Sequence, residues 1–116
     1  MGTIIKNGIV YSNGMSDTGW VNTDITGVSV RRKNGVVFVR FQGGQTLSCE
    51  ANAWTDAGTL PEGFYPDQSA DILVPVSNLS SFILFRFAVD GAIKIYSPVA
   101  IVANTVQIRG SGSYPV

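Results

Sequence analysis

The chain has 116 residues, which is enough for one domain with a single core and too few for two. Eight basic and eight acidic residues give a formal net charge of +0, which argues against nucleic-acid binding, because that function needs a basic patch or a high pI. Charged residues make up only 14% of the chain, against about 25% in ordinary soluble domains, and this deficit indicates that oligomerisation covers part of the surface.

Turn signals divide the chain into short apolar runs, and no window shows helical periodicity. Asn7-Gly8, Asn34-Gly35 and Asp90-Gly91 each predict a two-residue type I′ hairpin turn, in which both central residues take a positive φ. The predicted strands are Ile4–Lys6, Ile9–Ser12, Val28–Arg32, Val36–Phe41, Gln45–Glu50, Asp71–Ser77, Phe82–Val89, Ala92–Tyr96, Val99–Val102 and Thr105–Arg109. The whole chain is therefore predicted to be all-β.

Short strands at this spacing are typical of an antiparallel β-sandwich or jelly roll. The predicted sandwich domain covers residues 23–116, and residues 1–22 are expected to form an N-terminal arm or hairpin before it. Pro75 interrupts the run Ile72–Val76, and a proline lacks the N–H group that a central strand donates. That run is therefore predicted to be an edge strand or to contain a bulge.

Two of the predicted strands are apolar on both faces. The only charge within Phe82–Val89 is Arg86, and the only charge within Val36–Phe41 is Arg40. A sandwich strand normally buries one face and exposes the other to water. The pattern indicates either a subunit interface over the second face or a cover supplied by the N-terminal arm.

Arg40 and Arg86 are also candidates for ligand contacts, because a guanidinium group donates two parallel hydrogen bonds to a carboxylate and can reach sugar hydroxyls. The structural alternative, which we favour, is an ion pair at a subunit interface or a charge at a strand end. A buried charge needs a partner, and either Asp71 or Glu50 could supply the carboxylate.

Two loops combine an aromatic side chain with a carboxylate, which is the composition of a saccharide site. Trp54 is followed by Asp56, and Tyr65 by Asp67. Sugars stack a C–H face on an aromatic ring while Asp, Asn or Arg side chains pair with their hydroxyls. The candidate ligand-binding residues are therefore Trp54, Asp56, Tyr65, Asp67 and Arg86. The alternative is that Trp54 and Phe64 plug one end of the sandwich, because large aromatic side chains dominate protein cores.

No residue pattern indicates catalysis, a metal or a cofactor. Cys49 is the only cysteine and histidine is absent, so neither a disulfide nor a zinc pattern can form. A lone thiol without an adjacent base is a poor nucleophile, and Cys49 is expected to be a buried strand residue. A small glycan hydrolase stays a minor alternative, since it would need a pair of carboxylates and none stands in a recognisable context.

The sequence predicts neither membrane insertion nor export by a signal peptide. No stretch approaches the roughly 18 apolar residues of a membrane helix. The first residues also lack the basic region followed by an apolar region that marks a signal peptide. Synthesis in the cytoplasm of a bacterial host is therefore expected.

Several segments resemble one known family. They are Arg32-Lys33-Asn34-Gly35-Val36-Val37, Leu60-Pro61-Glu62-Gly63-Phe64-Tyr65-Pro66, Ile72-Leu73-Val74-Pro75-Val76 and Asp90-Gly91-Ala92-Ile93. The stretch from about Gly27 to Tyr114 is similar to the C-terminal receptor-binding or head domain of bacteriophage tail-fibre and minor structural proteins. Within the second segment, Pro61 and Pro66 restrict φ on either side of Gly63, so a structural turn is expected there.

The resemblance implies an antiparallel β-sandwich, often a tumour-necrosis-factor-like jelly roll, assembled as a homotrimer. It implies a location in the virion, as a tail fibre or surface appendage in contact with other virion proteins. It also implies host attachment through a bacterial surface receptor, which we expect to be a saccharide, without enzymatic activity. The alternative is a purely structural fibre cap or capsid decoration that binds no ligand.

Overall fold

The computed structural model describes residues 3–6, 9–12, 15–43, 46–76 and 80–116. All regular structure within these ranges is β, as predicted, and no described helix is long and apolar enough to cross a membrane. The strands are β1 Thr3–Lys6, β2 Ile9–Ser12, β3 Met15–Ser16, β4 Val21–Asn22, β5 Val28–Lys33, β6 Val36–Gly43, β7 Thr55–Thr59, β8 Ala70–Val76, β9 Ser81–Phe87, β10 Ala92–Tyr96 and β11 Ile108–Pro115.

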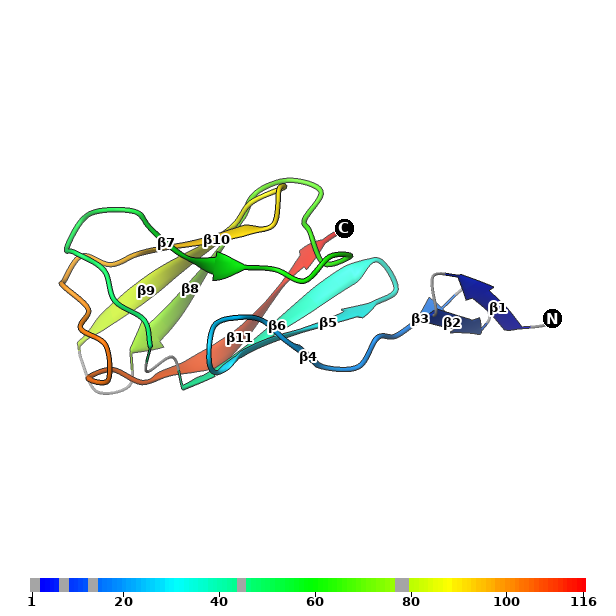
Figure 1. The fold of residues 1–116 in the computed structure, drawn as a ribbon, viewed down its shortest axis with the longest axis horizontal. Coiled ribbons are helices and arrows are strands. Elements are labelled where there is room, and N and C mark those ends of the chain that lie inside the picture. Colours follow the sequence, from blue (N-terminus) through cyan, green and yellow to red (C-terminus); the bar gives the residue numbers. More distant parts are fainter. Residues whose placement is uncertain (1–2, 7–8, 13–14, 44–45, 77–79) are drawn as a thin grey trace.

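Antiparallel pairing joins these strands into two sheets (Figure 1). The smaller sheet has the order β1-β2-β3 and lies beyond one end of the larger sheet. The larger sheet has eight strands in the order β4-β5-β6-β11-β8-β9-β10-β7. Among the described residues, a single pair, Ile108 with Val76, joins β11 to β8, and the sheet folds over at this weak seam into two layers.

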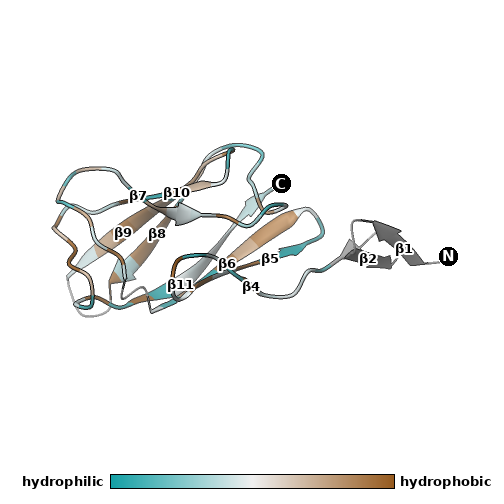
Figure 2. Cartoon of the chain, viewed as in Figure 1, coloured by the Kyte–Doolittle hydropathy of each residue, from teal (hydrophilic) through white to brown (hydrophobic). Residues whose placement is uncertain are grey.

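The core fills the space between the layers β4-β5-β6-β11 and β8-β9-β10-β7. Side chains of a strand alternate between its two faces, so every second residue of β6 and β9 is buried. The ring of Phe41 on β6 meets the ring of Phe85 on β9 with centroids 4.6 Å apart, which ties one layer to the other. Figure 2 shows β6, β8 and β9 among the most hydrophobic parts of the chain.

The structure confirms an antiparallel all-β fold with sandwich-like layers. Most pairings join strands that follow one another along the chain, such as β5 with β6 and β8 with β9. A jelly roll is built from Greek keys, in which a later strand returns to lie beside an earlier one. Only the pairings of β11 and β7 have that long-range character here, so the jelly-roll connectivity stays a prediction.

The predicted turns have different outcomes. Asn34 and Gly35 have φ values of 54° and 78°, which confirms positive φ at both central residues of that turn. The two-residue turn predicted at Asp90-Gly91 is wrong, because Asp90 does not have the positive φ that such a turn requires. Among the described non-glycine residues, only asparagines have a positive φ. The Gly91 N–H donates to the Ala88 carbonyl at 2.9 Å, which closes a longer loop ending in one left-handed glycine. The predicted Asn7-Gly8 turn lies outside the described residues.

Two predicted strands are wrong. Within the described part of Gln45–Glu50, and within Val99–Val102, the only β pairing is an isolated bridge between Cys49 and Ile101. The short strands β4 and β7 were not predicted, and the last strand starts at Ile108, near the end of the run Thr105–Arg109. The sequence of β7, Thr-Asp-Ala-Gly-Thr, lacks the alternating apolar residues by which a strand is recognised.

Pro75 lies in a strand that is paired along its full length with only one neighbour. It stands opposite Phe82 of β9, while the other edge of β8 is joined to β11 only through Val76. Most of the described length of that edge is therefore unpaired, which is the setting in which a strand tolerates a proline. This agrees with the predicted edge character of the strand.

The Leu60–Pro66 segment closes one end of the sandwich. Leu60 and Phe64 are buried, and Gly63 between them has a φ of 92°. The hydroxyl of Tyr114 on β11 donates to the Phe64 carbonyl. Desolvation raises the pKa of this phenol, which therefore stays a donor. The segment is structural, as its prolines and glycine predicted.

Candidate functional site

A row of charged side chains crosses the outer face of the second layer. Asp71 of β8 stands opposite Arg86 of β9, and Arg86 stands opposite Lys94 of β10. Residues directly opposite one another in an antiparallel sheet project from the same face. Arg86 therefore lies in the middle of this face, between a carboxylate and an ammonium group.

Asp71 fixes the orientation of the Arg86 side chain. The Arg86 Nε donates to Asp71 Oδ1 at 2.8 Å, and Nη2 donates to Oδ2 at 3.0 Å. These bonds from Arg86 lower the pKa of the Asp71 carboxyl below its ordinary value, so the pair is charged at neutral pH. Asp71 is thus confirmed as a partner of Arg86, but the pair forms within one chain and not, as expected, across a subunit interface. Since both side chains are partly exposed, it adds little stability and mainly positions the guanidinium.

Trp54 lies on the guanidinium of Arg86. The Arg86 Cζ is 4.1 Å from the indole centroid, and the ring of Tyr96 is 5.4 Å away on another side. The Tyr96 hydroxyl donates to Asn52 Oδ1 at 3.0 Å, which fixes the tyrosine in turn. The indole is 40% exposed, so Trp54 does not plug the end of the sandwich. It forms an aromatic plate held in place by neighbours and open to solvent.

An open cavity of about 740 Å³ borders the Trp54 plate. Glu50, Thr55 and Ser48 supply polar groups around it, and Val102 supplies an exposed apolar side chain. Aromatic surface beside a few convergent polar groups is typical of small-molecule sites. The cavity and the plate together can accept a ring with one apolar face and hydroxyls at its edge.

Cys49 lines the same cavity and is buried. Its N–H donates to the Ile101 carbonyl at 3.0 Å, so its backbone belongs to the isolated bridge and not to a strand. Burial raises the pKa of the thiol, which disfavours the nucleophilic thiolate. No group of three or more metal-ligating side chains occurs among the described residues.

The other predicted site residues are not gathered at Trp54. Tyr65 is exposed and lies against Gly91, which precedes β10, whereas Trp54 contacts the last residue of that strand. Asp67 is exposed, and its N–H donates to the Pro115 carbonyl at 3.3 Å. Asp56 of β7 stands opposite Lys94 of β10, and it lines a separate small cavity. The structure thus unites Trp54 with Arg86 and leaves the two-loop site divided.

Sequence reasoning missed Tyr96 as part of this cluster, whereas Asn52 was expected beside Trp54 from its place in the same loop. Tyr96 lies two residues after Lys94 in β10, so both side chains project from the same face of the strand. This spacing is a signal that could have placed both on the outer face. Asn52 has a φ of 59°, a conformation that asparagine tolerates better than most residues.

Comparison with known proteins shows which fold this chain shares. No protein-family model matches the sequence, and no curated protein sequence matches it. The crystal structure of the head domain of the lactococcal phage bIL170, from work on the receptor-binding domains of lactococcal phages, is similar with a TM-score of 0.62 and 22% identity. The similarity covers 84% of this chain and 96% of that one. The chain therefore has the fold of a phage head domain.

Proposed function

We propose that this chain is a non-enzymatic receptor-binding domain of a bacteriophage virion appendage that attaches to a saccharide on the bacterial surface. The observation that supports it most is the fold shared with a phage head domain over nearly the whole of that domain. In this proposal the binding domain begins before the predicted residue 23, because β4 pairs with β5 and Asp17 bonds to Arg31. The separate sheet β1-β2-β3 forms an arm towards other virion proteins.

The Trp54 cluster is the proposed receptor site. A pyranose ring would stack on the exposed face of Trp54, whose indole is kept in place by Arg86 and Tyr96. Sugar hydroxyls would then reach Glu50 and Thr55 at the border of the cavity. A plate already held by its neighbours loses little conformational entropy on binding, which favours affinity.

Replacing Trp54 by alanine is expected to lower binding of the fluorescently labelled protein to host cells by about tenfold or more, the loss of roughly 1.4 kcal/mol or more that hot-spot aromatic residues carry. The measurement is cell binding by flow cytometry over a panel of bacterial strains. Tyr65→Ala is the matched control, because Tyr65 is equally exposed at 40% and lies away from the cluster.

The control separates the possible sites. If Tyr65→Ala lowers cell binding by about tenfold and Trp54→Ala leaves it unchanged, the receptor site lies in the Leu60–Pro66 loop. If the wild-type protein binds no strain and no surface glycan, the domain is a structural cap and the proposal fails.

We also propose that the domain is a homotrimer whose contact surface is the apolar end of the outer face of β8 and β9, on the side of Leu73 away from the Asp71–Arg86 pair and the Trp54 cluster. Leu73, opposite Leu84, is 57% exposed, and Pro75 and Phe82 form the next pair of the same face. Exposed apolar side chains that are neighbours in this way are typical of an interaction surface.

Light scattering coupled to size exclusion is expected to give a mass near three times the 12.4 kDa of one chain. Replacing Leu73 by aspartate would place a charge in the contact and lower that mass, while Val102→Asp, at an exposed residue on a different segment, would leave it unchanged. A wild-type monomer would overturn the trimer, and an unchanged mass for Leu73→Asp would move the contact elsewhere.

A further inference from the structure

A second cavity lies on the outer face of the other layer. Its volume is about 550 Å³, and no sequence argument pointed to it. Its lining combines two aromatic rings, two cations and two hydroxyls, from Trp20, Phe38, Arg31, Lys33, Ser111 and Ser113. Both aromatic rings are about 40% exposed, so they present open surface to a ligand.

The strand register explains the hollow. Arg31 of β5, Phe38 of β6 and Ser113 of β11 stand opposite one another, and Ser111 stands opposite Arg40 in the next row. These residues project from one face, because they are direct cross-strand neighbours. Short serine side chains on β11 beside the large side chains of β5 and β6 leave a depression with hydroxyls along one side.

The segment before β4 forms the other wall of the cavity. The Trp20 ring lies over Arg40, with Cζ 4.3 Å from the ring centroid. Asp17 accepts bonds from both Nε and Nη2 of Arg31, and the Thr18 N–H donates to the Arg32 carbonyl at 3.0 Å. These contacts hold the segment along β5, so Trp20 is presented as a fixed plate.

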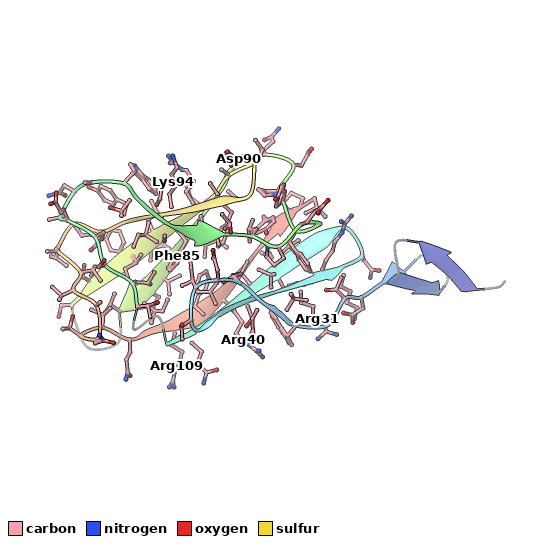
Figure 3. All side chains as sticks on the ribbon, in the orientation of Figure 1. Arg31, Arg40, Phe85, Asp90, Lys94 and Arg109 are labelled. Atoms are coloured by element: carbon pink, nitrogen blue, oxygen red, sulfur yellow. The ribbon has the colours of Figure 1, made fainter. Side chains whose placement is uncertain are left out.

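Charge is segregated on the molecule. This face carries four cations, Arg31, Lys33, Arg40 and Arg109, and one carboxylate, Asp17, for a balance of +3. Outside it and the N-terminal Lys6, three cations stand against seven carboxylates, a balance of −4. Figure 3 shows Arg31, Arg40 and Arg109 on one side of the sandwich, opposite Asp90 and Lys94. A neutral chain thus has one cationic face, which attracts anions.

We propose that this cavity, which we call the Trp20 cavity, binds an acidic saccharide, a sugar ring that carries a carboxylate or a phosphate. The ring would stack on Trp20 and Phe38, and its hydroxyls would bond to the serines. The acidic group would pair with Lys33 of the lining and with Arg40, which stands beside the cavity, opposite Ser111 and against Trp20. This goes beyond the proposed receptor site, since it is a second site in the other layer with its own charge preference. The apolar face proposed for trimer contact belongs to the β8 and β9 layer, which leaves this face free.

The indole N–H signals of Trp20 and Trp54 in the ¹⁵N spectrum of the full chain test the proposal, since they are the two tryptophans of the sequence. Trp20→Phe and Trp54→Phe variants assign them. The probes are trigalacturonic acid and its neutral methyl ester, with mannose 6-phosphate against mannose as the phosphate pair. The acidic member of at least one pair is expected to shift the Trp20 signal in a saturable manner, and more strongly at low salt because the attraction is screened by ions.

Which acidic probe binds more tightly distinguishes a carboxylate from a phosphate ligand. Trp20→Ala and Arg40→Gln are each expected to weaken that binding by about tenfold, whereas Tyr65→Ala, at an exposed aromatic residue outside both cavities, leaves it unchanged. A Trp20 signal that responds to no probe, or equally to the acidic and neutral members, overturns the proposal. A response of Trp54 alone overturns it too, and would instead support the receptor site. Because the readout uses soluble sugars, it does not depend on attachment to cells.

Discussion

Replacing Phe41 by alanine is expected to destabilise the domain by about 3–5 kcal/mol, the range found when a large buried aromatic side chain is truncated. Phe41 is 1% exposed, and its ring contacts Phe85 and Phe87, with centroids 4.6 and 6.4 Å away. These contacts join β6 to β9 across the two layers. The loss would consume much of the roughly 5–15 kcal/mol by which a domain is stable. Chemical denaturation at one fixed protein concentration measures it, since an oligomer is stabilised by mass action.

Phe38 provides a control on the same strand. It has the same side chain, but it lies on the outer face and is 40% exposed. Phe38→Ala should cost about 1 kcal/mol, since little area is lost from the core. Comparable losses for the two variants would contradict the assignment of inner and outer faces on β6. A large cost for Phe38 alone would mean that another chain covers this face, which would also exclude a ligand from the Trp20 cavity.

Much of the sandwich could be predicted because its strands carry local signals. The alternation in Val36–Phe41 and the Asn34-Gly35 turn determine one hairpin without reference to the rest of the chain. β7 carries no such signal. Its Gly58 is required by a distant residue, because a Cβ there would lie 2.3 Å from Asp24 Oδ1, which accepts the N–H bond of Thr59. A strand defined by a partner far away in sequence is not visible in local periodicity.

The candidate sites, like the strands, could be predicted only where the signal is local. Trp54 and Arg86 were recognised by their chemistry, and the structure brings them into contact. Their grouping with Tyr65 and Asp67 failed, because that inference used proximity in sequence and not strand register. Arg40 was recognised in the sequence as a lone charge. The pairing of β5 with β6 and β11 places it opposite Ser111 and against the Trp20 ring, and these two residues line one cavity with Phe38.

Replacing Gly91 by alanine is expected to cost about 2–4 kcal/mol, from two separate effects. Gly91 has a φ of 90°, where an L-residue pays about 1–2 kcal/mol. A Cβ at this position would also lie 2.4 Å from Tyr65 Cε1, so the ring must move, and such overpacking costs about 1–3 kcal/mol. The Leu60 N–H donates to the Gly91 carbonyl at 2.7 Å, so the disturbance reaches the Leu60–Pro66 segment. Denaturant unfolding measures the total.

Two further variants separate these effects. Gly35 has a φ of 78° and nothing near its Cβ position, so Gly35→Ala reports the backbone cost alone. In a Tyr65→Ala background, Gly91→Ala should fall to the cost of Gly35→Ala, because the clashing ring is gone. If the cost in that background stays at its full value, the ring is not the obstacle. The expected coupling means that the Leu60–Pro66 segment and Gly91 depend on each other. The aromatic ring of Tyr65 packs on the backbone of Gly91, where no side chain stands in its way.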